Sequence, residues 1–124
     1  MLKLCLCLLV YLNCCISSFG QYVHMRYDDS TRLAALKKSL PSLNKFSRID
    51  YLNQISIEHE NFVLMDGSPD NADSALLYAS SAYDEASRIG YNAGRIYSLL
   101  LLAKGEMLKD SDQAAVKYLS DPLF

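Results

Sequence analysis

Beyond residue 15 the sequence contains no cysteine. The four cysteines of the 124-residue chain all lie in its first segment, at Cys5, Cys7, Cys14 and Cys15. Within an apolar segment they act as small hydrophobic side chains, and their spacing fits neither a zinc site nor a disulfide framework. The rest of the chain therefore has no covalent cross-link, and its stability must come from packing alone.

Runs of basic residues are also absent, since Lys37 and Lys38 form the longest group of cations in the chain. The formal net charge at pH 7 is −2. Nucleic acids and anionic membrane surfaces attract clustered positive charge. We therefore expect neither of them as a partner.

The patterns that mark metal sites are missing as well. His24 and His59 lie far apart, without a cysteine or carboxylate at metal-ligand spacing. Asp66, Asp70 and Asp73 lie close together but lack the glycine and the closing glutamate of a calcium-binding loop. Turn formation and helix capping explain these aspartates better than a metal ion does.

Catalytic motifs are equally absent. The chain has no Gly-x-Ser-x-Gly nucleophile motif and no glycine loop that could hold a phosphate. Glu58, Glu60 and Glu85 have no evident partner with which to form a tuned acid and base pair. We therefore expect no enzyme activity, no cofactor and no bound metal in this chain.

What the sequence does contain begins with an apolar leader. Residues 1–20 place one cation, Lys3, before an apolar run over residues 4–12 and a small-residue stretch that ends at Gly20. This is the layout of a secretory signal peptide, and the run is about half the roughly 20 residues of a membrane-spanning helix. We expect cleavage before Gln21 and a periplasmic or extracellular protein. The alternatives are an uncleaved membrane anchor, or lipid attachment at Cys14 or Cys15.

The remainder predicts an all-α protein, because apolar residues recur with helical spacing. Residues 21–46 form a helical lead-in, and residues 47–124 form the main body. A loop is expected over residues 65–73, which contain Asp-Gly and Ser-Pro. The predicted helices are residues 30–40, 47–60, 73–89 and 93–108, followed by a short one from about residue 113.

The third of the long helices carries an unusual stripe of small residues. Ala75, Ala79, Ala82 and Ala86 are four, three and four positions apart, so they share one helical face. A face that packs on a core normally carries large apolar side chains. Small residues there predict that neighbouring helices approach this face very closely.

A pattern recurs at an offset of 40 residues, which suggests an internal repeat of paired helices. Ala75-Leu76-x-Tyr78-Ala79 corresponds to Ala115-Val116-x-Tyr118-Leu119. With Leu52-Asn53-Gln54-Ile55-Ser56 and Ile89-Gly90-Tyr91-x-x-Gly94, this pattern resembles tetratricopeptide (TPR) repeats of the longer kind. Such repeats occur in the exported sensor regions of bacterial histidine kinases and related regulators. The resemblance covers residues 48–119.

The resemblance implies roles for individual residues. It places the small residue at the close crossing of each helix pair on Ser56 and Ala103, where the family usually has glycine. It places further crossing and packing residues on Ala75, Ala82, Leu99 and Ala115. The chain departs from the family pattern by an insertion over residues 66–71 and by the sequence that follows Tyr118.

The function implied is non-catalytic binding of a protein or peptide on the concave face of the repeats. The groove-facing positions are Asp50, Asn53, Gln54, Ile57, Tyr97, Leu100, Lys104 and Met107. One hypothesis makes the chain the N-terminal part of a signalling sensor whose kinase or DNA-binding part lies outside it. The alternative is a free-standing exported scaffold or binding protein. We expect membrane attachment only through an uncleaved leader or through a downstream segment that is missing from this chain.

Self-association is a further expectation. About three repeats are needed for stability in such arrays, and this chain has two helix pairs after its lead-in. Val116, Leu119, Leu123 and Phe124 would then form an uncovered apolar surface, which promotes association through the C-terminal end.

Overall fold

The computed structural model describes residues 30–124. The predicted leader, its cleavage site and all four cysteines lie outside the described residues. The chain divides into two compact units, residues 1–34 and residues 35–124. A helix runs over residues 30–39 of the described part, and the second unit holds all the other elements.

The described residues are helical, with no strand among them, so the predicted all-α class is confirmed. After the helix of residues 30–39 come a 3₁₀ turn, three long helices and a short one. They are η1 (Leu40–Ser42), α2 (Lys45–Asp66), α3 (Pro69–Ile89), α4 (Asn92–Leu108) and α5 (Asp112–Leu119).

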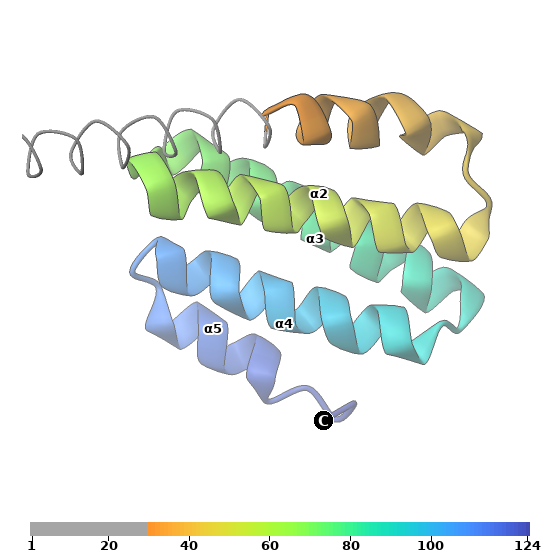
Figure 1. Cartoon of the computed structure of the whole chain (residues 1–124). Coiled ribbons are helices and arrows are strands. Elements are labelled where there is room, and N and C mark those ends of the chain that lie inside the picture. The colour runs from red at the N-terminus through yellow and green to blue at the C-terminus, as the bar shows by residue number, and fades with distance from the viewer. Residues whose placement is uncertain (1–29) are drawn as a thin grey trace, which may run out of the picture. The chain divides into compact units, whose positions relative to one another are not determined.

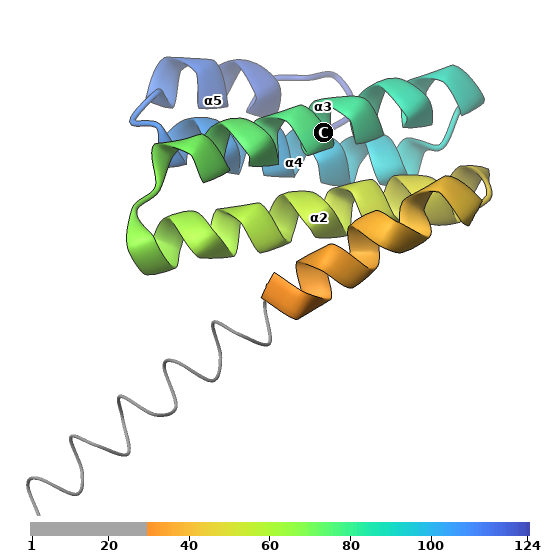
Figure 2. The same cartoon turned by 90° about the horizontal axis from the view of Figure 1, so that it is seen from above.

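Helices α2 to α5 follow one another in antiparallel pairs (Figure 1). Seen along two directions, α2 and α4 lie in one layer, and α3 and α5 lie in the other (Figures 1 and 2). Helix α3 packs against both α2 and α4, while α2 and α4 also contact each other. Helix α5 packs against α4. This succession is consistent with the packing of a helical repeat protein.

The ends of the long helices follow from local capping. The Asn44 side chain accepts a hydrogen bond from the Ser47 backbone N–H at 3.3 Å, which satisfies one free donor at the start of α2. Gly67 and Gly90 end α2 and α3 with φ of 68° and 71°. That left-handed conformation favours glycine. The predicted end of the alanine-rich helix at Ile89 is therefore confirmed.

The loop predicted over residues 65–73 is wrong in its extent. Helix α2 continues to Asp66 and α3 begins at Pro69, so only Gly67 and Ser68 connect them. Proline is accepted in the first turn of a helix because the N–H it lacks would have no partner there. The Asp66 carboxylate accepts a hydrogen bond from the Ser68 backbone N–H at 3.0 Å and tightens the turn. The predicted insertion over residues 66–71 is thus mostly helix.

The alanine stripe is buried in full. Ala75, Ala79, Ala82 and Ala86 have at most 1% of their surface exposed, and Ala72, also 1% exposed, extends the stripe by one turn. Ala82 and Ala86 belong to a cluster of buried residues with Ile49 and Leu52 of α2. Ala79 belongs to a second cluster with Leu101 and Leu102 of α4. The stripe therefore lies between α2 and α4, where small side chains let the helices approach.

The residues that the resemblance places at helix crossings and packing positions are also buried. The Ser56 hydroxyl donates a hydrogen bond to the backbone carbonyl of Ala75 at 2.8 Å, so α2 and α3 touch at that point. Because these residues are buried at helix contacts, larger side chains in their places would have little room. The set is Ser56, Ala75, Ala82, Leu99, Ala103 and Ala115.

Candidate functional site

The predicted groove-facing residues lie on α2 and α4, which are neighbours in one layer. On α4 they form an exposed, mainly apolar line. Tyr97, Leu100 and Met107 expose 46%, 43% and 57% of their surface. Their spacing, with Lys104 between them, puts all four on one side of the helix. We call these four residues the α4 face.

On α2 two of the predicted residues, Asn53 and Ile57, pack against other parts of the protein. Asn53 is 1% exposed, and its Oδ1 accepts a hydrogen bond from the Ser98 hydroxyl at 2.9 Å. Ile57 packs against the buried cluster that contains Ala79. Neighbouring helices therefore cover the Asn53 side chain, while Ile57 is only partly buried.

The two remaining α2 positions lie nearer the surface. Asp50 is exposed, and its Oδ1 accepts a long hydrogen bond from the Tyr91 hydroxyl at 3.4 Å. This neighbouring carboxylate raises the pKa of Tyr91. Gln54 is half-buried and donates to the Glu58 carboxylate at 3.2 Å. Asp50 and Gln54 are thus at least partly exposed on α2, which contacts the helix that carries the α4 face.

An ion pair joins α2 to the α4 face. Glu60 has no exposed surface, and its Oε2 lies 2.7 Å from Nζ of Lys104. Burial raises the pKa of the Glu60 carboxyl, and the Lys104 ammonium opposes that shift. Among residues 30–124, Glu60 Oε1 has no hydrogen-bond partner. Lys104 is therefore held by a buried carboxylate while half of its side chain remains exposed.

His59 is a structural residue. It is 6% exposed, its Nδ1 lies 2.8 Å from Oδ1 of Asn71, and its ring stacks on Tyr78 with 5.6 Å between ring centroids. Burial lowers the pKa of His59, which favours the neutral ring. Since Asn71 Oδ1 can only accept, Nδ1 carries the proton. These contacts make His59 part of the packing between α2 and α3.

Each of the carboxylates that lacked an evident partner in the sequence has one in the structure. Glu85 of α3 pairs with Arg48 of α2, and Glu60 pairs with Lys104. Glu58 accepts a hydrogen bond from Gln54. The first two partners stand 37 and 44 positions away in sequence and come from other helices, so spacing along the chain could not identify them.

The three aspartates of the α2–α3 connection act separately. Asp66 caps the turn, Asp70 lies in the first turn of α3, and Asp73 accepts a hydrogen bond from Lys109 at 2.6 Å. Within residues 30–124 no group of three or more histidine, cysteine, aspartate or glutamate side chains could hold a metal ion. No helix in this part of the chain is long and apolar enough to cross a membrane.

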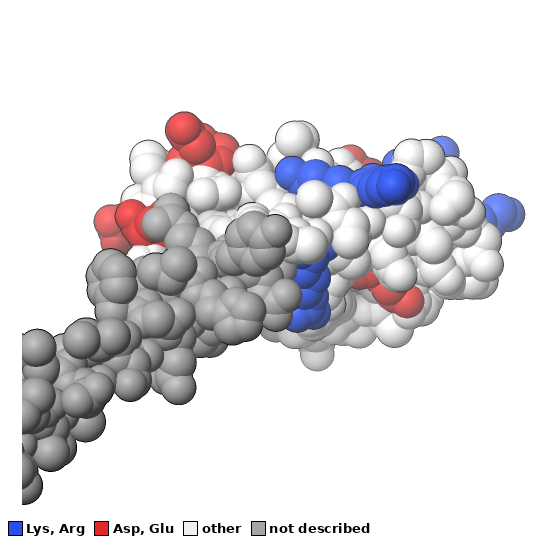
Figure 3. Space-filling model, turned by 45° about the horizontal axis from the view of Figure 1, so that its top comes forward, with Lys and Arg blue, Asp and Glu red and all other residues white. Residues whose placement is uncertain are grey.

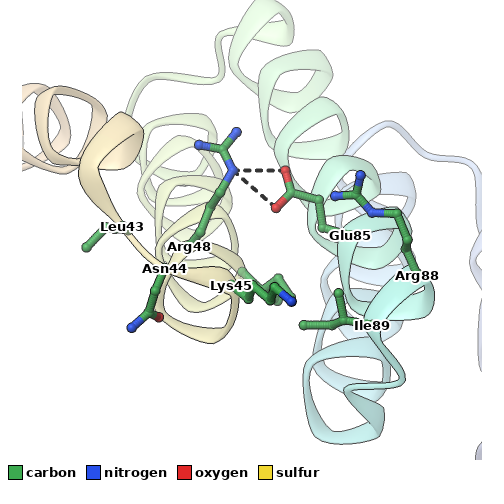
Figure 4. A pocket seen from close by; sticks show the side chains of 8 residues that line it. Leu43, Asn44, Lys45, Arg48, Glu85, Arg88 and Ile89 are labelled. Atoms are coloured by element: carbon green, nitrogen blue, oxygen red, sulfur yellow. Dashed lines mark hydrogen bonds and ion pairs between the residues drawn. The ribbon is translucent and has the colours of Figure 1, made fainter.

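A pocket lies between the start of α2 and the end of α3 (Figure 4). Its volume is about 330 Å³. It was not predicted, because its lining residues are about 40 positions apart and share no motif. The lining combines cations, one carboxylate and apolar side chains, namely Leu43, Asn44, Lys45, Arg48, Ile49, Glu85, Arg88 and Ile89.

Elsewhere the surface charges are mixed. On the face in Figure 3, acidic and basic side chains of the described residues lie in small separate groups, with uncharged surface between them. We therefore consider two local features of residues 35–124 as candidate binding sites: the α4 face and the pocket.

Comparison with known proteins gives no match: neither a protein-family model, a curated protein nor a solved structure is significantly similar to this chain.

Proposed function

We propose that this chain is a non-catalytic, TPR-like helical repeat module that binds a protein or peptide on the α4 face. The observation that carries the proposal is the exposed line of Tyr97, Leu100 and Met107. Three large apolar side chains on one side of a helix form a surface that a partner can cover favourably.

Two features support the α4 face as a binding surface. Its helix is tied to α2 by the Glu60–Lys104 ion pair and by the Asn53–Ser98 hydrogen bond. Rigid support lowers the entropic cost of binding, because the surface is already in place. Helices α2 and α4 also share one layer, as the first helices of successive repeats do in a solenoid.

The resemblance to sensor regions gives this binding its proposed context. An exported module that captures a protein or peptide would serve as the ligand-sensing part of a bacterial signalling protein. The leader supports export, and mass spectrometry of the secreted protein should find an N-terminus at Gln21. An intact Met1, or a lipid-modified cysteine, would contradict this part of the proposal.

Selection from a phage-displayed library of random peptides on the full chain tests the binding function. We expect enriched peptides rich in apolar residues, whose binding weakens at least about tenfold in Leu100→Ser, since burying a leucine contributes roughly 1.5–3 kcal/mol. Leu77→Ser is the matched control, because Leu77 is 65% exposed but lies on α3. Equal loss in both variants, or no enrichment, would contradict the proposal.

A further inference from the structure

The residues that line the pocket between α2 and α3 carry a net positive charge, whereas the whole chain is net negative. Lys45, Arg48 and Arg88 line it together with one carboxylate, that of Glu85. The pocket is thus surrounded by more positive than negative charge, although the whole chain carries a formal charge of −2. A concave site with an excess of one sign of charge attracts ions of the opposite sign.

The three cations are not equally engaged. Arg48 Nε donates to both Glu85 oxygens, at 3.0 and 3.1 Å, and Nη1 donates to the Leu40 carbonyl at 3.2 Å. Lys45 and Arg88 form no ion pair within residues 30–124. Arg48 therefore builds the pocket wall, while Lys45 and Arg88 keep their hydrogen-bond donors for a bound anion.

The other walls are apolar. Leu43, Ile49 and Ile89 line the pocket between the cations, and Figure 4 shows Lys45 extending from α2 toward Ile89 of α3. A volume of about 330 Å³ lies at the lower end of the range for ligand pockets, roughly 300–1,000 Å³. A site of this size and lining suits a small organic anion with an apolar part.

We propose that this pocket binds a short-chain carboxylic acid in its ionised form. The carboxylate accepts hydrogen bonds from Lys45 and Arg88, and the apolar tail lies against Ile49 and Ile89. This inference goes beyond the proposed function, because none of the residues of the α4 face lines the pocket. The two can therefore fail independently.

The test is a titration of the ¹⁵N-labelled full chain with 4-methylpentanoate, followed by two-dimensional NMR. We expect saturable shifts of the Lys45, Ile49, Arg88 and Ile89 amide signals. Two further probes separate charge from shape: neutral 4-methylpentanamide and inorganic sulfate. Each should bind at least about tenfold more weakly, because charge-assisted hydrogen bonds and apolar burial each contribute more than about 1.4 kcal/mol.

The variant Lys45→Gln/Arg88→Gln removes the two free charges and keeps the Glu85 carboxylate paired, whereas a change at Arg48 would leave that carboxylate without its partner. It should weaken 4-methylpentanoate binding at least about tenfold. The matched control is Lys117→Gln, an exposed cation of α5, which should bind as the parent does. Shifts that are absent or spread over the whole chain, equal binding of the amide or of sulfate, or an unaffected double variant would each overturn the proposal.

Discussion

The Ser56 hydroxyl of α2 lies 2.8 Å from the Ala75 carbonyl oxygen of α3, and Ser56 has no exposed surface. A side-chain hydroxyl can reach the backbone of a neighbouring helix only where the two helices come very close together. This contact marks the tight crossing of the first helix pair.

Ser56→Leu should therefore destabilise the protein by about 1–3 kcal/mol, because the larger side chain forces the two backbones apart. Ser56→Ala should cost about 1 kcal/mol or less, since it removes one hydrogen bond and no bulk is added. Urea denaturation of the full chain measures both. A Ser56→Leu variant as stable as the parent would show that the crossing can widen freely.

Ala82→Leu tests the alanine stripe at a second point. Ala82 has no exposed surface and packs with Ile49 and Leu52 of α2, so the change should cost about 1–3 kcal/mol through overpacking. Ser80→Leu is the matched control, because Ser80 is exposed on the same helix, and it should stay within about 0.5 kcal/mol of the parent. Equal melting temperatures for the two variants would show that the alanine stripe does not lie at a close contact between helices.

Glu60→Gln should stabilise the protein at neutral pH by about 1 kcal/mol or more, because it removes a buried charge whose desolvation exceeds what one ion pair returns. The pKa of Glu60 is raised from 4.5 in the folded state, so the folded protein holds this proton more tightly. The parent therefore loses stability as pH rises from about 4.5 through the folded pKa.

The difference in stability between Glu60→Gln and the parent should thus shrink as pH falls, and below pH 4.5 it should be smallest. Urea denaturation at a series of pH values measures it. His59, whose pKa is lowered, contributes the opposite slope below pH 6.5, but it is present in both proteins and cancels in the comparison. A difference that does not change with pH would mean that Glu60 titrates normally.

Self-association through α5 gives a further prediction. Val116 and Leu119 expose 60% and 46% of their surface and lie three residues apart on one helical face. Val116→Lys should reduce any rise of scattering mass with protein concentration, because a charge opposes burial of that face. Leu77→Lys, on α3, should leave it unchanged. A monomeric parent at high concentration would contradict this expectation.

Periodicity in the sequence predicts much of this fold, and the limits of that prediction have physical causes. The end of α3 and the burial of its alanines follow from local rules, namely helical spacing and the left-handed glycine at Gly90. The extent of the loop at Pro69 was wrong because proline both breaks a helix and begins one. Sequence alone cannot tell which role applies.

The candidate sites were less accessible to prediction. Spacing placed Tyr97, Leu100 and Met107 on one side of a helix, and their exposure agrees with that placement. Spacing also grouped Asn53 with them, but its burial depends on Ser98, 45 positions away. The pocket likewise depends on Arg48 meeting Glu85, a tertiary contact that no local pattern encodes.

The polar contacts of α2 also decide which helix can stand beside it. Asn53 meets Ser98 and Glu60 meets Lys104, both on α4. A slide of α2 by one turn, about 5.4 Å, would separate both pairs and leave buried polar groups unpaired, at about 1–3 kcal/mol each. Alanines alone would tolerate such a slide. The position of α2 against α4 therefore depends on Ser98 and Lys104, and a helix without these two residues could not replace α4 without leaving Asn53 and Glu60 unpaired.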